Sequence, residues 1–372
     1  MPLMRLCEVS MKLLQWCKAN AMPVIAVLAA AVTAVFVPPD AAYLGYYDVK
    51  TLSCLLCVLA VVGALRRVGL FPLLAQKLVQ VFHTTRGAVA ALVSITLLTN
   101  DTALLTFLPL SWFVLERTGQ TKWAALTFIL QNCAANLGGM LTPFGNPQNL
   151  YLFNHYNIPN GEFLSIMLPP FLLSTVLILL CCLLLPRERL TVPRQETLPD
   201  KRRTAIYGVL FCVAVAMVLR GIPYWLGLLV IVAALLVLDR RALLGVDWGL
   251  LVTFAAFFTF SGNMARIELV RELFRKLLTH GAMPVAALTS QVISNVPAAI
   301  LLSRFTDDYR GLLVGVNIGG AGTLVASLAS LITFREYTKH VKGQAGRFMV
   351  LFSAISFGFL AVLLAAMTLW MR

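Results

Sequence analysis

Amide and hydroxyl side chains, interleaved with glycine and proline, occur in two apolar stretches of the sequence. Segment 123–153 contains Asn136-Leu-Gly-Gly-Met-Leu-Thr142-Pro-Phe-Gly-Asn146-Pro-Gln-Asn149, and segment 311–334 contains Asn317-Ile-Gly-Gly-Ala-Gly-Thr323 ahead of Ser327. A continuous helix does not pass comfortably through so many Gly, Pro and Asn residues. Breaks of this kind free backbone carbonyls for a hard cation such as Na⁺ and expose helix N-termini that favour an anion. We therefore predict an ion- or anion-binding site built from interrupted helices.

Two more apolar segments carry a polar break near the middle. Segment 87–115 breaks at Thr99-Asn100-Asp101-Thr102, and segment 282–303 breaks at Ser294-Asn295-Val296-Pro297. A helical hairpin that enters and leaves the membrane on one side fits both. The predicted substrate- and ion-binding residues are Thr99, Asn100, Asp101, Thr102, Asn136, Thr142, Asn146, Asn149, Ser294, Asn295, Asn317, Thr323 and Ser327, with Na⁺ expected at Asn100, Asp101 and Asn295.

Asp101 is the charged side chain within these apolar segments. A charge at mid-membrane costs about 2.5–3.5 kcal/mol or more, so an ionisable residue there is a functional hypothesis by default. Asp101 either binds the coupling cation, Na⁺ or H⁺, or caps a helix that starts near Ala103. The sequence leaves both open.

The surface that holds these segments must face lipid. The 372 residues are 59% hydrophobic and 12% charged, with a mean hydropathy of +0.85, whereas soluble domains carry about 25% charged residues. Charge-free runs at 21–37, 51–65, 204–219 and 348–370 approach or exceed the length of a membrane span. The net charge of +14 lies in short loops, which the positive-inside rule explains without a nucleic-acid partner.

Loop charges also predict the topology. With a cytoplasmic N-terminus and both hairpins re-entrant, most of the 30 Lys and Arg residues fall on the cytoplasmic side. The predicted fold is an all-α polytopic inner-membrane protein with nine full spans, two re-entrant hairpins and two broken helices.

An internal repeat accompanies this topology. Asp48, Gly63 and Arg67 recur at one constant offset as Asp247, Gly262 and Arg266, and the broken-helix motif at Asn136 recurs at Asn317. The two copies have opposite orientation in the predicted topology. Inverted repeats with discontinuous helices are the architecture of secondary transporters.

The four motifs, in this order, resemble the ion transporter superfamily, which includes arsenite permease-like proteins, citrate carriers and divalent anion–sodium symporters. The resemblance implies a secondary transporter of a small anion or oxyanion (a carboxylate or an arsenite-like species), coupled to Na⁺ or H⁺, with elevator-like motion. It also implies a homodimer and no cofactor. In the symporters a Ser-Asn-Thr motif at each hairpin tip binds substrate carboxylate and helps hold Na⁺. By similarity these roles fall on Asn100-Asp101-Thr102 and Ser294-Asn295-Val296, where Asp101 and Val296 depart from the pattern.

This reading divides the chain into five parts. Residues 1–86 are the scaffold part of repeat 1, 87–185 its transport part and 186–203 a cytoplasmic linker. Residues 204–280 form a linking span and the scaffold part of repeat 2, and 281–372 its transport part.

Two alternatives are kept. The first is a Na⁺/H⁺ antiporter of the same superfamily, in which Asp101 exchanges the two cations. The second is a membrane-embedded transferase, which usually needs paired acidic groups for Mg²⁺. Position 104 is Leu rather than a second carboxylate, and the sequence has no His-Glu-x-x-His motif. We therefore do not expect an enzyme.

Overall fold

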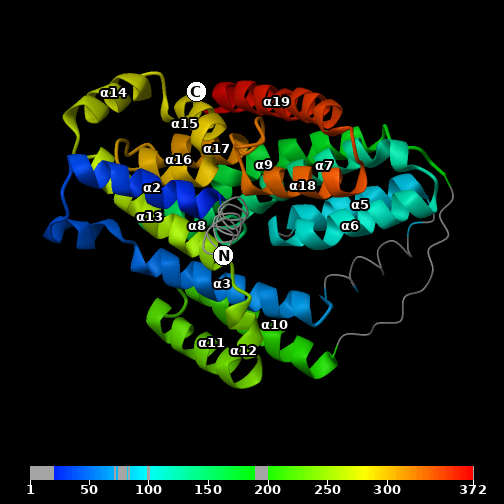
Figure 1. The fold of residues 1–372 in the computed structure, drawn as a ribbon, viewed down its shortest axis with the longest axis horizontal. Coiled ribbons are helices and arrows are strands. Elements are labelled where there is room, and N and C mark those ends of the chain that lie inside the picture. Colours follow the sequence, from blue (N-terminus) through cyan, green and yellow to red (C-terminus); the bar gives the residue numbers. More distant parts are fainter. Residues whose placement is uncertain are drawn as a thin grey trace, which may run out of the picture.

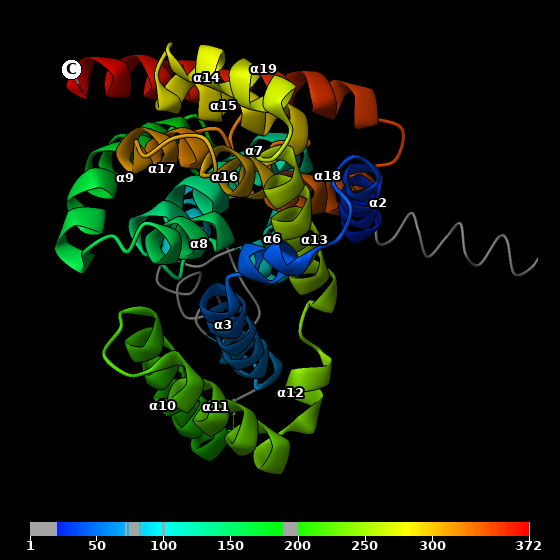
Figure 2. The ribbon, with the colours of Figure 1, turned by 90° about the vertical axis from the view of Figure 1, so that its left-hand side faces the viewer.

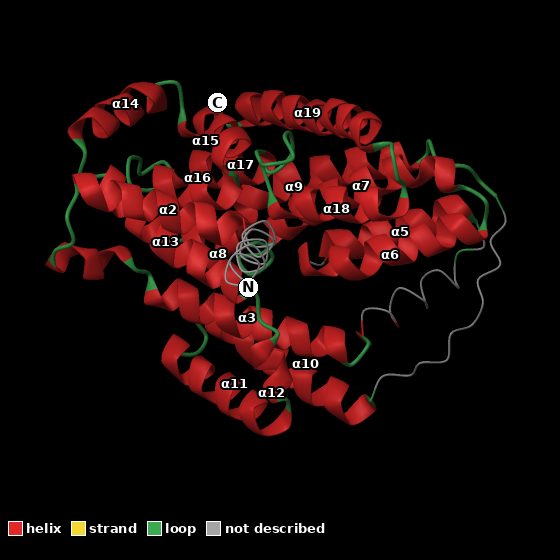
Figure 3. Cartoon of the chain, in the orientation of Figure 1, coloured by secondary structure: helices red, strands yellow, loops and turns green. Residues whose placement is uncertain are grey.

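The structure is a computed structural model that describes residues 21–70, 73, 82, 84–98, 101–188 and 200–371. Helices dominate this part of the chain, and it contains no β-strand (Figure 3). The predicted all-α fold is confirmed in the described residues.

The first half of the chain contains seven α-helices and three short 3-10 turns in its described part. They are α2 (Ala21–Phe36), η1 (Ala41–Tyr46), α3 (Val49–Arg67), α5 (Thr85–Leu98), α6 (Asp101–Arg117), η2 (Thr121–Trp123), α7 (Ala124–Gly138), η3 (Gly139–Leu141), α8 (Pro147–His155) and α9 (Asn160–Cys182).

The second half continues with ten helices. They are α10 (Lys201–Val218), α11 (Tyr224–Leu238), α12 (Arg240–Leu244), α13 (Trp248–Met264), α14 (Glu268–Leu278), α15 (Ala282–Ile293), α16 (Asn295–Leu302), α17 (Tyr309–Ile318), α18 (Leu328–His340) and α19 (Ala345–Trp370).

Four helical stretches in the described residues are long and apolar enough to cross a membrane by themselves: Val49–Arg67, Thr121–Leu141, Asn160–Cys182 and Ala345–Trp370. Helix α13 forms a further candidate only together with α14, from which it is bent by 95°. The predicted count of nine spans is therefore not established by helix length. Helices α2 and α11, at 16 and 15 residues, are shorter than the roughly 20 residues that a span normally needs.

Three of the four predicted breaks separate helices in the described residues, and the fourth, at Thr99-Asn100, lies outside them. Helix α5 ends at Leu98 and α6 begins at Asp101, while α15 and α16 are separated at Ser294. Within each pair the two helices pack against each other, as the arms of a hairpin do. Helix α7 gives way to α8, and α17 to α18, across the two Gly-rich motifs. The same series of helix, hairpin, broken helix and long apolar helix thus occurs twice along the chain.

The two series are interlocked. Helix α8 packs against α16 and α17 of the second series, and α18 packs against α6 and α7 of the first. Helices α10 and α11 pack on α3 below them, α3 in turn contacts α8 and α13, and α2 lies alongside α13 (Figures 1 and 2). The broken helices therefore lie where both halves of the chain meet.

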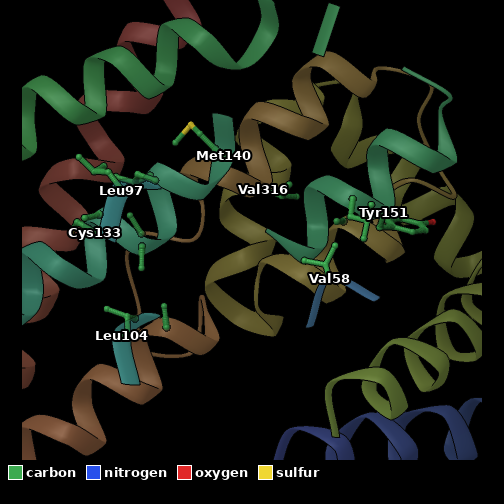
Figure 4. Close-up of a cluster of buried hydrophobic side chains, with 14 of the residues drawn as sticks. Val58, Leu97, Leu104, Cys133, Met140, Tyr151 and Val316 are labelled. Atoms are coloured by element: carbon green, nitrogen blue, oxygen red, sulfur yellow. The ribbon is translucent and has the colours of Figure 1, made fainter. Parts of the chain in front are cut away.

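Buried apolar side chains from both series form one core. Figure 4 shows part of this core, with Leu97 and Cys133 at one side, Tyr151 at the other and Met140 and Val316 between them, and all five are nearly or fully buried. Small residues let the backbones come close: a Cβ added at Gly138 would lie 2.3 Å from the carbonyl oxygen of Leu97. Such close approach is typical of helix packing in membranes.

Short polar side chains begin several helices. The side chains of Asp48 and Asp247 accept hydrogen bonds from the backbone N–H groups of Thr51 and Leu250, at 2.9 and 3.0 Å. These are N-cap bonds, which satisfy donors that the first helical turn leaves free. The two aspartates of the repeat therefore start corresponding helices, α3 and α13.

Candidate functional site

One asparagine forms hydrogen bonds with the unwound backbone of the first broken helix. The Asn149 amide Nδ2 donates to the carbonyl oxygens of Gly139, Met140 and Thr142, each at 3.2 Å. Asn149 is fully buried, and these carbonyls are among those that the end of α7 leaves without helical partners. The unwound backbone is thereby satisfied from within the protein, as a membrane interior requires.

Asn146 stands at the start of α8, with Pro147 at the first helical position. Its side chain makes no capping bond there. The Nδ2 atom instead donates to the backbone carbonyl of Asn136 at 3.0 Å, which ties the restart of the helix to the end of α7. Asn146 is thus the N-cap residue of α8, followed by proline, but its side-chain bond reaches across the break and not into its own helix.

The second broken helix is held by a residue outside its own sequence motif. Gln291, near the end of α15, donates through Nε2 to the carbonyl oxygens of Gly319 and Ala321 at 2.8 and 3.1 Å. Its Oε1 accepts the backbone N–H of Thr323 at 2.9 Å, and the Thr323 hydroxyl donates to the Gln291 carbonyl. Gln291 therefore does for the second loop what Asn149 does for the first.

The tip of the second hairpin is bound to this same loop. Ser294 has φ +78°, a left-handed conformation that is rare for a residue with a side chain. The backbone N–H of Asn295 donates to the carbonyl of Ala326 at 2.9 Å, and the Ser294 hydroxyl donates to that carbonyl at 3.3 Å. The Asn295 Oδ1 atom accepts the backbone N–H of Val296 at 2.9 Å.

Amide side chains from both series converge at Gly320. A Cβ added there would lie 3.0 Å from Nδ2 of Asn295 and 3.4 Å from Oδ1 of Asn136. Nearby, Nδ2 of Asn317 donates to Oδ1 of Asn149 at 2.6 Å, and Nε2 of Gln148 donates to Oδ1 of Asn317 at 3.2 Å. The breaks that lie far apart in the sequence thus form one cluster of amides and unwound carbonyls.

Most of the predicted site residues lie in or beside this amide cluster. Asn136, Asn146, Asn149, Ser294, Asn295, Asn317 and Thr323 take part in the contacts just described, and Thr142 contributes its carbonyl. Ser327 caps α18 by accepting the backbone N–H of Ser330 at 3.2 Å. Thr99 and Asn100 lie outside the described residues. Asp101 and Thr102 begin α6, and only their backbone is described.

Two residues that form hydrogen bonds in this part of the structure, Gln291 and Gln148, are not among the predicted site residues. Gln291 stands three residues before Ser294 in an otherwise ordinary helix, and Gln148 lies inside the first motif without being singled out. The available signal for Gln291 was an amide within an apolar segment directly ahead of a predicted break. Its partners belong to a loop that only the fold brings near.

A cavity of about 700 Å³ opens onto the amide cluster. Its lining includes Ser294, Asn295 and Gln148 from the cluster and Leu331 of α18. It also includes the last turn of α3, with Arg66, and the start of α13. The volume lies within the roughly 300–1,000 Å³ typical of sites for small molecules.

The opposite end of α3 is closed by contacts. Nδ2 of Asn154 donates to Oγ1 of Thr51 at 3.1 Å, and Nη2 of Arg304 donates to the carbonyl of Tyr46 at 3.0 Å. The Tyr46 ring packs onto Gly262, where an added Cβ would lie 2.5 Å from the ring. The amide cluster is therefore accessible from one end of α3 and sealed at the other.

An ion pair supports this closed end. Both Nη atoms of Arg266 donate to the carboxylate of Asp40, at 2.7 and 3.0 Å. The guanidinium lowers the pKa of the Asp40 carboxyl below its usual value, so the pair persists at neutral pH.

Apolar helices, interlocked halves and a polar cluster at interrupted helices define a multi-pass membrane transport protein. The sequence model described as "Citrate transporter" matches residues 11–307. The chain belongs to this citrate transporter family.

Three curated relatives agree with that assignment. An uncharacterised transporter of Methanocaldococcus jannaschii is 31% identical over 323 residues, which is 85% of this chain and 88% of the relative. The inner membrane protein YbiR of Escherichia coli is 32% identical over 280 residues, or 72% and 74% of the two chains. A silicon efflux transporter of rice is 30% identical over 176 residues, or 43% and 36%. The family and these relatives support a transporter rather than an enzyme.

Proposed function

We propose that the protein is a secondary active transporter of a small anion or oxyanion, coupled to Na⁺ or H⁺. The observation that carries the proposal is the meeting of Asn136, Asn295 and Asn317 around Gly320, at the edge of a cavity. Unwound carbonyls and amide oxygens at such a place suit a small cation. The starts of α8 and α18 offer backbone N–H groups to an anion, whereas those of α16 are taken by Ala326 and by the Asn295 side chain. One cluster therefore has ligands for both the substrate and a coupling ion.

The comparisons favour an oxygen-rich substrate. The family model is described as "Citrate transporter", and the rice relative is named as a silicon efflux transporter. Citrate and the oxygen compounds of silicon both present several oxygen atoms to amide and hydroxyl donors. We propose a substrate of this general class for the amide cluster.

We further propose that the two helix series are inverted repeats that alternate access to the site. The two series can be aligned by matching Asp48 with Asp247 and Asn146 with Ser327. In this alignment, three contacts at the closed end of α3 join residues whose equivalents lie at the open end. The closed contacts are Tyr46 with Gly262, Thr51 with Asn154, and the rings of Tyr151 and Phe258 at 5.5 Å. Their counterparts are Gly245 with Gly63, Leu250 with Arg335, and Ile332 with Leu59, and all six of these residues line the cavity.

This exchange supports an elevator-like cycle. A transporter built from inverted repeats reaches its other state when the repeats swap conformations. The open end carries Arg66, Arg67 and Arg335, so the positive-inside rule assigns it to the cytoplasm. We therefore propose that the protein lies in the inner membrane with its N-terminus on the cytoplasmic side. In this structure its cavity opens toward the cytoplasm.

Transport by purified protein in liposomes tests the proposal. Vesicles receive an inward Na⁺ gradient or an inward H⁺ gradient, and the uptake of labelled citrate, phosphate, sulfate and arsenite is measured. We expect accumulation of at least one of them under one of the gradients. Acidification or alkalinisation driven by Na⁺ alone, without uptake of any anion, would favour the Na⁺/H⁺ antiporter and overturn the proposal. Absence of both activities would also overturn it.

A further inference from the structure

We infer that Arg66 and Arg335 form an anion-binding mouth on the cavity, which holds a small oxygen-rich anion on its way to or from the amide cluster. The direction of passage rests on the proposed function. The mouth itself rests on the cavity and on the charges that line it.

One cavity contains both the arginines and the hairpin tip. Arg66 ends α3 and Arg335 lies on α18, and both line the space that Ser294 and Asn295 also line. Arg66 is partly buried, while Arg335 is exposed. An anion in this cavity is therefore within reach of both the guanidinium groups and the hairpin tip.

The charges of this lining are unbalanced. Its ionisable residues include three arginines and Asp247. The Nε atom of Arg67 lies 3.5 Å from the carboxylate of Asp239, and Asp247 is engaged in capping α13. Arg66 and Arg335 form no ion pair within the described residues. Guanidinium groups without a carboxylate partner can bind an oxyanion through two parallel hydrogen bonds.

The corresponding positions of the other helix series lack this charge. Ala265 takes the place of Arg66, and Asn154 takes the place of Arg335. Arg266 takes the place of Arg67, but its guanidinium is bound by Asp40. At these paired positions, the guanidinium groups without a carboxylate partner are therefore those of Arg66 and Arg335, which both line the cavity.

The positive-inside rule alone does not require this arrangement. Arg240 and Arg241 lie near the same end and satisfy that rule, and neither lines the cavity. Arg66 and Arg335 differ from them in bordering the space that leads to the site. The distinction supplies a matched control, since Arg241 is exposed and carries the same charge.

The electrostatic potential at the mouth can be measured without knowing the substrate. A cysteine-free variant with Leu331→Cys, a cavity-lining position one turn before Arg335, is reconstituted in phosphatidylcholine nanodiscs. Its rate of reaction with anionic sulfonatoethyl methanethiosulfonate is divided by that with the cationic trimethylammonioethyl reagent. Both rates are normalised to free cysteine. If Leu331→Cys fails to fold, Thr253→Cys reports from the same cavity.

We expect the ratio to fall about tenfold in Arg66→Gln/Arg335→Gln, since charged clefts raise the local concentration of counter-ions by about 10–10³. Arg241→Gln should leave it unchanged, and citrate should slow the anionic reagent only while both arginines are present. A ratio that stays within about twofold overturns the inference. Protection by added phosphatidylglycerol but not by citrate also overturns it, because the arginines then hold a lipid phosphate.

These outcomes are separable from the transport test. The labelling ratio depends on the charges of the cavity and not on movement of any substrate. If no anion is transported while the ratio depends on Arg66 and Arg335, the proposed function fails and the binding mouth remains. If transport proceeds with the same KM after both arginines are removed, the mouth alone is wrong.

Discussion

Replacing Gln291 with leucine removes the amide that holds the second unwound loop while keeping a side chain of similar length. The carbonyls of Gly319 and Ala321 lose their donor, and the N–H of Thr323 loses its acceptor. The bond from Nε2 to the carbonyl of Ala287 within α15 is lost as well, whereas the Thr323 hydroxyl keeps its bond to the backbone of Gln291.

The size of the effect follows from these three groups. A buried polar group left without a partner costs about 1–3 kcal/mol. Gln291 and Thr323 are only partly buried, so water reaches some of the freed groups and the lower end applies. We expect about 3 kcal/mol in total. In a chain of this size that corresponds to a loss of about 3–6 °C in Tm.

Thermal unfolding in detergent and uptake into liposomes measure the two consequences. Transport should fall at least about tenfold, which is the equivalent of about 1.4 kcal/mol, because the loop carries Gly320 against Asn136 and Asn295. Thr289→Val is the control, since it removes only a bond within α15. It should change neither quantity appreciably.

Gln291→Glu separates hydrogen bonding from side-chain volume. The carboxylate can still accept the N–H of Thr323 but has no donor for the carbonyls of Gly319 and Ala321. Because its volume is close to that of glutamine, we expect Tm and transport to fall about as they do in Gln291→Leu. If Gln291→Leu keeps both its Tm and its transport rate, the amide does not support the loop and the reasoning is refuted.

Three other expectations test the site and the topology. Asn100→Ala and Asn295→Ala should each lower transport at least about tenfold in protein that still folds, the scale of one or two lost hydrogen bonds; near-normal uptake in both would make the breaks purely structural. Asp101→Asn should abolish ion-driven accumulation and flatten its dependence on Na⁺ or pH with little change in stability, whereas unchanged coupling would leave Asp101 a structural residue. In a cysteine-depleted chain, an impermeant thiol reagent applied to intact cells should label a cysteine at position 308 but not one at 195, and the reverse pattern contradicts the inverted topology.

The helix breaks could be predicted because their chemistry is local. Proline and glycine disfavour a helix wherever they occur, so the breaks after Gly138 and Ile318 could be read directly from the sequence. The meeting of the breaks followed from the repeat, which paired Asn136 with Asn317.

The features that could not be predicted depend on residues that are distant in the sequence. Asn146 is the N-cap residue of α8, but the bond of its side chain to the carbonyl of Asn136 depends on how the two broken ends meet. Gln291 is marked only as an amide in an apolar segment, and its partners in the loop at 319–323 become its neighbours only in the fold. The number of membrane spans could not be predicted from the local sequence pattern either. Apolar content locates α2 and α11, but their lengths of 16 and 15 residues do not say how they cross the bilayer.

The interlocking of the two helix series has a consequence for biosynthesis. Helix α8 is translated long before α16 and α17, the helices it packs against. Until they emerge, the Asn149 side chain lacks Asn317 as a partner, and the first half holds an unfinished polar break in lipid. The ribosome therefore releases a half-built site that only the end of the chain completes. A chain cut short after α9 keeps that polar surface exposed, which gives membrane quality control a chemical signal for recognising incomplete copies.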